Sequence, residues 1–383
     1  NQGNSLKYWD ALNSLDFFVV QDLWKTPTVG AADIVLPVCH WLEVDCPRLS
    51  QGATGAQGAN CRCIEPPADC HFDVDIILDV YKRMGIPWAD DPVSYGLPEG
   101  VQWPTTEQLY DRTISTTGLT WQEYKESFQE HGWWDCRAIN PEVWGTYRRY
   151  ETGRMSAIGE TPAGNPMKGF STPTRKQELW STVMETYEPS GKFNLPTWEP
   201  APRTELADPS IVEEWPFLMT TGRRIPVYFH SEHRQLPWCR ELWPVPKCEI
   251  NPVDAEKLGV TQGDWVWIES PEGKVRQTVD LYYGVEPGVI NCEHQWWYPE
   301  LDQAGGGFEL STINCLVTGE DQDPICGASY LRAYNVKVYK ATADNSPFGN
   351  PVPCGEDGTP IICDASDPRL LDWMPNYEIR NEA

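Results

Sequence analysis

A run of short strand patterns, preceded by one well-marked helix, constrains the fold of this chain more than any other feature. The strand patterns are Asp264–Ile268, Lys274–Tyr283, Val289–Glu293 and Tyr334–Tyr339. Ahead of them, Asn251 and Pro252 provide a cap and a first helical residue, and Gly259 ends the helix. Short strands at this spacing with one inserted helix predict a compact, mainly β-barrel domain over residues 216–340.

The stretch PFLMTTGRRIPVYFHSEHR, residues 216–234, opens this domain and gathers polar groups at the end of a strand. Its glycine lets a backbone N–H approach a ligand closely. The arginines at positions 223, 224 and 234 offer planar donor forks for a phosphate or the edge of a heterocycle. In a chain with a formal charge of −26 this cluster predicts an anionic, polar ligand, with surface salt bridges as the alternative.

The first half of the chain carries the patterns of an α/β domain. Phe17–Val20 and Ala32–Pro37 are short apolar runs, which are typical of buried strands in a parallel sheet covered on both faces. Asp22 and Thr26 follow the carboxyl end of the first run, where open α/β sheets bind ligands, although the same residue types also stabilise ordinary turns. Helices are predicted at Asp73–Met84, Thr120–Glu130 and Lys176–Glu185. The first of these helices has an apolar face made of Val74, Ile77, Leu78, Tyr81 and Met84.

The 383 residues are enough for two or three domains. The proline-rich, polar stretch Pro196–Pro209 predicts a connection between domains. The predicted organisation is an α/β domain with a loop-rich insertion over 1–200, a linker at 201–215, the barrel at 216–340 and an acidic wrapping tail at 341–383.

Charge and cysteine content limit the partners. The charge of −26 argues against nucleic acid or an anionic membrane, and no apolar run of about 18 residues is present to span a bilayer. The 13 cysteines form no CxxC pair, which predicts reduced and mostly buried thiols. A metal or iron–sulfur site is the alternative for the densest group, Cys39, Cys46, Cys61, Cys63 and Cys70. Because the chain begins at Asn1 and a strand follows almost at once, we expect the C-terminal part of a longer polypeptide.

Six sequence motifs follow one another between residues 15 and 340. They are FVVQDLWKTPTVGAADIVLP, GFSTPTRKQELWS, TTGRR with FHSEHRQLP, INPVDAEKLGVTQGDWVWIESPEGKV, EHQWWYPE and STINCL. In this order they resemble the C-terminal part of the molybdopterin oxidoreductase, or dimethyl-sulfoxide reductase, family. The motifs HSE, HxWWxPE and GFxTPT are similar to those of one branch of this family, which contains acetylene hydratases, phenolic hydroxytransferases and catechol dehydroxylases. Arg175 stands where the family usually has glycine, and Gln295 stands where that branch usually has glycine.

The resemblance implies the end of a Rossmann-like parallel-sheet domain followed by a double-psi-barrel-like domain. It also implies a bis(molybdopterin guanine dinucleotide) cofactor that carries molybdenum or tungsten. Asp22 and Thr26 would hold a guanosine of this cofactor. The pterins and their phosphates would be bound by Thr221, Gly222, Arg223, His230, Ser231, Glu232, His294, Trp296, Asn314 and Arg332. The metal's protein ligand would lie upstream of residue 1, and a [4Fe-4S] cluster would lie upstream or in a partner subunit, so no catalytic residue is assigned.

One extended cofactor would have to reach both groups of binding residues. We therefore expect Asp22 and Thr26 to face residues 221–232 across a crevice between the two domains.

The resemblance implies a redox enzyme, for which reductive dehydroxylation of a phenolic, catechol-type substrate is the preferred reaction. Hydration or hydroxyl transfer, a nonenzymatic cofactor carrier, and a sugar-binding or aspartic-protease-like barrel are the alternatives. The expected partners are the N-terminal remainder of the polypeptide, an iron–sulfur electron-transfer subunit and a small aromatic substrate. Whether the protein stays in the cytoplasm or is exported is left open.

Two further interpretations concern individual side chains. His230, His233 and His294 could instead form a zinc site, because three histidines can make an open set of ligands. The aromatic run Trp296–Tyr298 could stack on a phenolic ring near the cofactor, with core packing as the equal alternative.

Overall fold

The computed structural model describes residues 3–48, 56–67, 69–132, 134–135, 172–223, 225, 227–330 and 332–373. The chain divides into two compact units, Asn1–Val35 with Trp198–Ala383, and Leu36–Thr197. Residues 1–35 therefore group with the barrel, whereas the predicted domain 1–200 placed them with the insertion. The predicted domain boundaries stay predictions. The residues GFS of the GFSTPT motif lie outside the described part of the chain.

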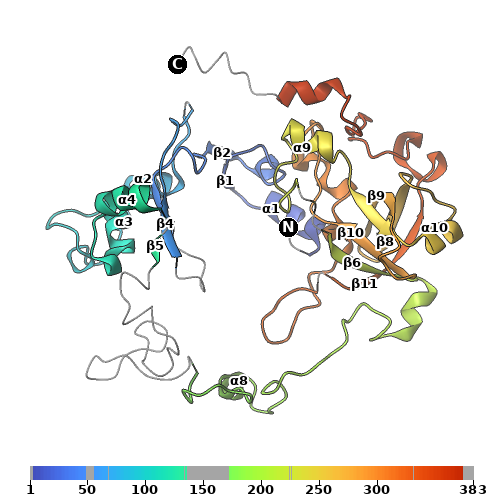
Figure 1. Ribbon diagram of the computed structural model, residues 1–383, viewed down its shortest axis with the longest axis horizontal. Coiled ribbons are helices and arrows are strands. Elements are labelled where there is room, and N and C mark those ends of the chain that lie inside the picture. Colours follow the sequence, from blue (N-terminus) through green and yellow to red (C-terminus); the bar gives the residue numbers. More distant parts are fainter. Residues whose placement is uncertain are drawn as a thin grey trace. The chain divides into compact units, whose positions relative to one another are not determined.

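The barrel of the first unit is closed, as predicted from the strand patterns (Figure 1). Its strands follow the order β10-β6-β11-β8-β9-β7, and β7 pairs with β10 to close the ring. They are β6 (Phe217–Arg223), β7 (Lys247–Ile250), β8 (Trp265–Ser270), β9 (Gly273–Leu281), β10 (Val289–Glu293) and β11 (Tyr334–Lys340). Two of the pairings, β6 with β10 and β7 with β9, are parallel.

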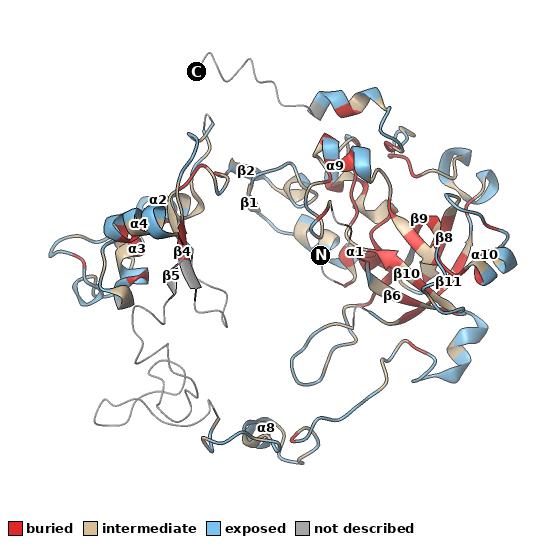
Figure 2. Ribbon diagram, in the orientation of Figure 1, coloured by how far each residue is buried: buried red, intermediate tan, exposed pale blue. Residues whose placement is uncertain are grey.

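The core of the barrel comes from the inward positions of these strands, which Figure 2 shows as its buried centre. Side chains at alternating positions of β7 are buried, as the period of a strand requires. Helix α10 (Pro252–Leu258) has the predicted ends: Asn251 Oδ1 accepts a hydrogen bond from Val253 N at 3.0 Å, and Gly259 adopts φ 65°. The two short helices η6 (Ala304–Leu310) and η7 (Ile313–Leu316) follow β10, and all of η7 is buried.

The N-terminal segment packs on this barrel unit through η6. It consists of α1 (Ser5–Asn13), β1 (Val19–Asp22), η1 (Val29–Ala31) and β2 (Ile34–Pro37). A Cβ added to Gly30 of η1 would lie 2.7 Å from the backbone nitrogen of Gly305, so only glycine allows this contact. The loop that carries Asp22 and Thr26 is thereby held close to the segment that follows β10.

The prediction that both N-terminal apolar runs are fully buried was wrong, although Val20 of β1 is buried. The strands β1 and β2 form a two-stranded sheet, and Phe17, Ile34 and Val35 are 62%, 44% and 44% exposed. Among the described strands, β1 and β2 pair only with each other, so they do not form part of a larger sheet. A Rossmann-like parallel sheet remains a prediction.

The second unit contains a three-stranded sheet and several helices. The strands are β3 (Cys46–Arg48), β4 (Ala56–Asn60) and β5 (Trp134–Asp135). The helices are α2 (Asp73–Met84), α3 (Thr106–Thr113), α4 (Trp121–His131), α8 (Thr182–Tyr187) and the single turns η3 (Val93–Tyr95) and η4 (Ser115–Thr117). Helix α2 has the predicted bounds, but of its predicted apolar face only Leu78 is buried.

Helix α4 begins at the predicted capping box, whereas α8 begins six residues later than predicted. Thr120 Oγ1 accepts from Glu123 N, and the Glu123 carboxylate accepts from Thr120 N at 2.9 Å. In front of α8, Thr174 and Thr182 both donate to the Glu178 carboxylate. These side-chain bonds favour a turn over residues 174–182, and they delay the start of the helix.

The predicted linker and tail both contact the barrel unit, the tail through Asn345, whose Oδ1 accepts a hydrogen bond from Trp267 Nε1 of β8 at 3.1 Å. Arg203 Nε donates to Asp321 Oδ2 at 2.7 Å, and Asn335 of β11 donates through its side-chain amide to Trp215 O. The linker region contains η5 (Pro209–Glu213), and the tail contains η8 (Ala343–Asn345), η9 (Pro347–Gly349) and η10 (Pro368–Trp373). None of the helices in the described parts of the chain has the length and apolar composition that a membrane span requires.

Candidate functional site

Two loops begin side by side because β6 and β10 are parallel neighbours. Their carboxyl ends lie at the same edge of the barrel, where Glu293 is paired with Arg223 after a bulge at Cys292 and Glu293. Bulges of this kind commonly redirect a strand next to a binding site. The chain after β6 and the chain after β10 therefore leave the barrel at one place, although about 70 residues separate them.

Two histidines join these loops. His230 Nδ1 and His294 Nε2 lie 3.0 Å apart, so one ring donates an N–H to the other. Nearby, Trp297 Nε1 donates to Ser231 O at 2.8 Å, which fixes the two backbones to each other. The pair lines a cavity of about 20 Å³, room for one water molecule. The cavity is lined by Ile225, Tyr228, Phe229, His230, Arg234, Glu293 and His294.

Arg234 is a buried cation, and none of its hydrogen bonds to the described residues goes to a carboxylate. It is 1% exposed, and its guanidinium carbon lies 3.8 Å from the ring centre of Tyr228 and 4.5 Å from that of Trp296. Its two terminal nitrogens donate to the backbone oxygens of Glu232 and His230. Burial lowers the pKa of Arg234 to about 10, so the group remains charged at neutral pH.

Glu293 places a buried carboxylate beside this arginine. Its oxygens accept hydrogen bonds from the indole nitrogens of Trp243 at 3.0 Å and Trp296 at 3.1 Å. Gln277 holds the backbone of the same residue from both sides, because its amide donates to Glu293 O and accepts from Glu293 N. Sequence reasoning took Glu293 only as a strand end and did not assign Trp243 or Gln277, since no local pattern connects them.

Backbone strain gathers in the same two loops. His230, His233 and Gln295 are non-glycine residues with φ of 53°, 72° and 60°. The left-handed region costs an ordinary residue about 1–3 kcal/mol, and it persists where the surroundings impose it, often at functional sites. The strain and the buried charges single out this edge of the barrel as the functional site.

Residues 217–334 match the protein family described as the molydopterin dinucleotide binding domain. The chain is 48% identical to dopamine dehydroxylase from Eggerthella lenta over 416 aligned residues, which cover 99% of this chain and 41% of that protein. The chain belongs to the molybdopterin oxidoreductase family. Its homologues include a putative dimethyl sulfoxide reductase catalytic subunit from Halobacterium salinarum and formate dehydrogenase H from Escherichia coli.

Acetylene hydratases are similar in both sequence and structure. The enzyme from Syntrophotalea acetylenica is 29% identical over 89% of this chain and 42% of its own length. The solved structure of acetylene hydratase from Pelobacter acetylenicus has a TM-score of 0.71 and 25% identity, and it covers 88% of this chain and 42% of that one. The chain thus spans about two fifths of the length of these relatives.

The residues present fit a molybdopterin cofactor. Gly222, the second-last residue of β6, has φ 150°, and a Cβ built there meets no described atom within 4 Å, so the backbone is open to the approach of a ligand. Arg234 Nε is a buried donor without a hydrogen-bond partner among the described residues. Phosphates and pterin edges are rich in acceptors, which suits such donors.

The predicted guanosine residues form a compact turn. Thr26 Oγ1 donates to Asp22 Oδ2 at 2.8 Å, and Trp24 N donates to Asp22 Oδ1 at 3.1 Å. A carboxylate has about four acceptor positions, so Asp22 can order this turn and still bind a ligand. Both residues lie in the same compact unit as the barrel. Contact of Asp22 and Thr26 with one cofactor shared by residues 221–232 stays a prediction.

The remaining predicted binding residues occupy different surroundings. Thr221 pairs with Cys292 inside the sheet, and Ser231 and Glu232 lie in the loop after β6. Asn314 is buried in η7, and Arg332 is exposed just before β11; neither lines the cavity. Arg223 ends β6, but its side chain and the whole of Arg224 lie outside the described part of the chain.

Two interpretations from the sequence are not supported. Within the described residues no group of three or more His, Cys, Asp or Glu side chains is arranged to hold a metal ion, and His233 is absent from the His230–His294 cavity. The aromatic run is buried, with Trp296, Trp297 and Tyr298 at 0%, 3% and 0% exposure, so core packing accounts for it. Phe229, at 54%, is the exposed aromatic side chain of the cavity lining.

The described cysteines are free, and half of them are buried. Cys248 and Cys292 face each other across β7 and β10 with their sulfurs 3.7 Å apart, and Cys63 and Cys326 are exposed.

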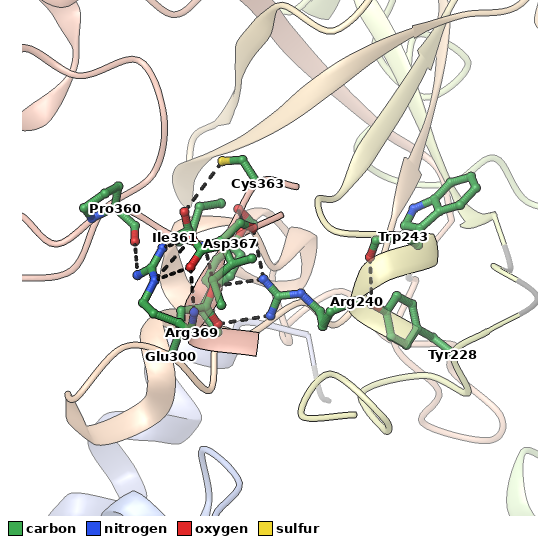
Figure 3. A network of polar contacts seen from close by, with 12 residues as sticks. Tyr228, Arg240, Trp243, Glu300, Pro360, Ile361, Cys363, Asp367 and Arg369 are labelled. Atoms are coloured by element: carbon green, nitrogen blue, oxygen red, sulfur yellow. Dashed lines mark hydrogen bonds and ion pairs between the residues drawn. The ribbon is translucent and has the colours of Figure 1, made fainter. Parts of the chain in front are cut away.

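The C-terminal tail is fastened to the loop after β10 by a buried ion pair (Figure 3). Arg240, in helix α9 (Pro237–Leu242), donates to the two carboxylate oxygens of Glu300 at 3.0 and 2.8 Å. Ile362 of the tail donates its N–H to Glu300 at 2.7 Å, and its carbonyl accepts from Arg240 at 3.1 Å. Arg369 adds a bond to Pro360 O and a pair with Asp367. The tail therefore helps to hold the segment that carries His294 and Trp296.

Proposed function

We propose that this chain is the C-terminal, cofactor-binding portion of the catalytic subunit of a molybdenum or tungsten enzyme that removes a hydroxyl group from a phenolic, catechol-type substrate. The observation that carries the proposal is the 48% identity to dopamine dehydroxylase, which extends over 99% of this chain. The cofactor in this proposal is bis(molybdopterin guanine dinucleotide).

The proposed role of this chain's own residues is to bind and orient the cofactor. The open backbone at Gly222 and the buried charge of Arg234 would face its acceptor groups. The His230–His294 pair can donate or accept a single proton at the cavity, depending on the tautomer. When bound, the cofactor supplies the two-electron redox chemistry.

Removal of a phenolic hydroxyl as water consumes two electrons and two protons, so the proposal requires an electron source. A [4Fe-4S] cluster, in the N-terminal remainder or in a partner subunit, is the proposed donor, since iron–sulfur clusters span the potentials needed. For the flat substrate, the exposed ring of Phe229 at the cavity is the proposed stacking surface.

The intact enzyme, assayed without oxygen with a series of catechols and a reduced viologen, tests the proposal. We expect two molecules of reduced viologen to be oxidised for each hydroxyl group that is removed. Metal and cofactor analysis of the same enzyme should find molybdenum or tungsten together with pterin. A second measurement compares Phe229→Ala with the matched control Phe348→Ala, whose ring is 68% exposed and lies outside the cavity. Phe229→Ala should raise KM for catechols several-fold, and the control should not.

Hydration or hydroxyl transfer is the second candidate, because acetylene hydratase shares both sequence and fold with this chain. Neither reaction consumes electrons overall. Turnover of an alkyne or a phenol with the viologen left reduced would replace the dehydroxylase proposal with this one. A native protein that holds pterin but lacks any upstream catalytic portion would instead indicate a nonenzymatic cofactor carrier.

A further inference from the structure

Gln295 occupies a backbone conformation that its residue type disfavours. It lies between His294 and Trp296 and has φ 60°. This is the left-handed region, which glycine adopts without strain and Asn tolerates. Glycine is the residue usual at this position in the branch that the sequence resembles. The backbone alone would therefore select against glutamine here.

The conformation is imposed by the residues on both sides. His294 is bonded to His230, and Trp296 donates its indole N–H to Glu293 and lies against the guanidinium of Arg234. Thr312 Oγ1 also donates to the carbonyl oxygen of Trp296. With both neighbours held, the chain must turn at position 295 whatever residue stands there.

The side chain of Gln295 is not explained by hydrogen bonding within the described chain either. Its amide oxygen Oε1 is buried and has no hydrogen-bond partner among the described residues. The buried Gln277 is the opposite case: its amide donates to Glu293 O at 2.7 Å and to Ser311 O at 3.2 Å, and its oxygen accepts from Glu293 N. The large majority of buried side-chain polar atoms have a hydrogen-bond partner, as those of Gln277 do.

We propose that Gln295 is a specificity-determining residue whose side-chain amide accepts a hydrogen bond from an N–H or O–H group on the ring of a bound molecule. Gln295 is only partly buried as a residue, so rotation about its side-chain bonds can bring the amide to a ligand. Two sources offer this chemistry, the edge of a pterin ring and the hydroxyl of a phenolic substrate. Only the second source rests on the proposed function.

The test uses two substitutions in the intact enzyme and one control. Gln295→Gly removes the amide and relieves the left-handed backbone, and Gln295→Asn keeps an amide on a residue that tolerates this conformation. The control is Phe348→Gly, which relieves another non-glycine residue with φ 56° at an exposed position outside the cavity. The measurements are the unfolding midpoint without cofactor, the pterin content of the purified enzyme, and kcat and KM for a catechol.

The proposal predicts that Gln295→Gly unfolds at the wild-type temperature or above it, as the control does, but loses ligand binding. If the source is the pterin, pterin content falls about three- to tenfold. If the source is the substrate, pterin content is unchanged and KM rises about three- to tenfold with kcat nearly constant. Gln295→Asn should restore part of either loss.

Two results would overturn the proposal. One is Gln295→Gly with wild-type pterin content and wild-type KM. The other is Gln295→Gly that unfolds at a lower temperature than the wild type or does not fold, which would assign the side chain to packing. Pterin content and unfolding are measured without turnover, so an enzyme that fails to dehydroxylate catechols would refute the proposed function and leave the pterin arm of this test intact.

Discussion

Breaking the Arg240–Glu300 pair should destabilise the barrel unit far more than breaking an exposed ion pair. The two side chains are 0% and 1% exposed, and they are joined by bonds of 3.0 and 2.8 Å (Figure 3). Burial alone would lower the pKa of Arg240, but Glu300 keeps it above its usual value. In the Glu300→Gln variant the guanidinium of Arg240 stays charged and buried, but residue 300 no longer supplies a negative charge.

The expected loss follows from the cost of an uncompensated buried charge. Removing one partner of a buried pair costs about 3–5 kcal/mol, whereas replacing both partners by neutral groups of similar size is often nearly neutral. Glu300 also accepts the N–H of Ile362, a bond that the oxygen of a glutamine can keep. We therefore expect a loss of about 3–4 kcal/mol for Glu300→Gln and of about 1–2 kcal/mol for Arg240→Met with Glu300→Gln.

Urea unfolding followed by circular dichroism measures these losses, and limited proteolysis measures release of the tail. The matched control is Glu320→Gln in the same unit, because the Lys7–Glu320 pair is 69% and 74% exposed at 3.6 Å. This control should change the free energy of unfolding by less than about 0.5 kcal/mol. The reasoning fails if the double variant loses as much stability as Glu300→Gln, or if Glu300→Gln behaves like the control.

Three further changes test other parts of the structure. Gly222→Ala puts a Cβ into the open side of β6 at φ 150°, so pterin content should fall several-fold while the unfolding midpoint falls by only a few degrees; equal losses would contradict the assignment. Gly30→Ala brings a Cβ to 2.7 Å from a backbone nitrogen of η6 and should cost about 1–3 kcal/mol in urea unfolding, and an unchanged midpoint would show that this contact is not made. Burial raises the pKa of Asp45, but hydrogen bonds from Arg62 N and Lys125 Nζ outweigh it and hold the pKa below its usual value. This stabilisation is present above the unfolded pKa of about 3.9 and is lost as pH falls through the folded value, so Asp45→Asn should flatten the acid limb of thermal unfolding between about pH 5 and pH 2.

Local patterns in the sequence were sufficient to predict most of the helices and strands. The capped helix at Pro252–Leu258, the strand Val289–Glu293 and the helix Asp73–Met84 depend on residues within a few positions of each other. Their signals are caps, turn residues and apolar spacing, all of which are readable along the chain. The spacing of the strand patterns also predicted a barrel, which is one of the folds that leave no strand edge unpaired. The six sequence motifs likewise indicated the molybdopterin oxidoreductase family, because each motif is a short stretch that can be recognised along the chain.

Only the tertiary structure decided which side chains meet. His230 and His294 are 64 positions apart, and their contact depends on the parallel pairing of β6 with β10 and on the bulge at its end. The same arrangement buries Arg234 against Trp296, so core packing, one of the two interpretations that the sequence left open, accounts for this tryptophan. Burial and partner choice arise from contacts between distant segments, and a pattern of period two or 3.6 carries no information about them. The left-handed turn at Gln295 has the same origin, because its neighbours on both sides are held by residues from other parts of the fold.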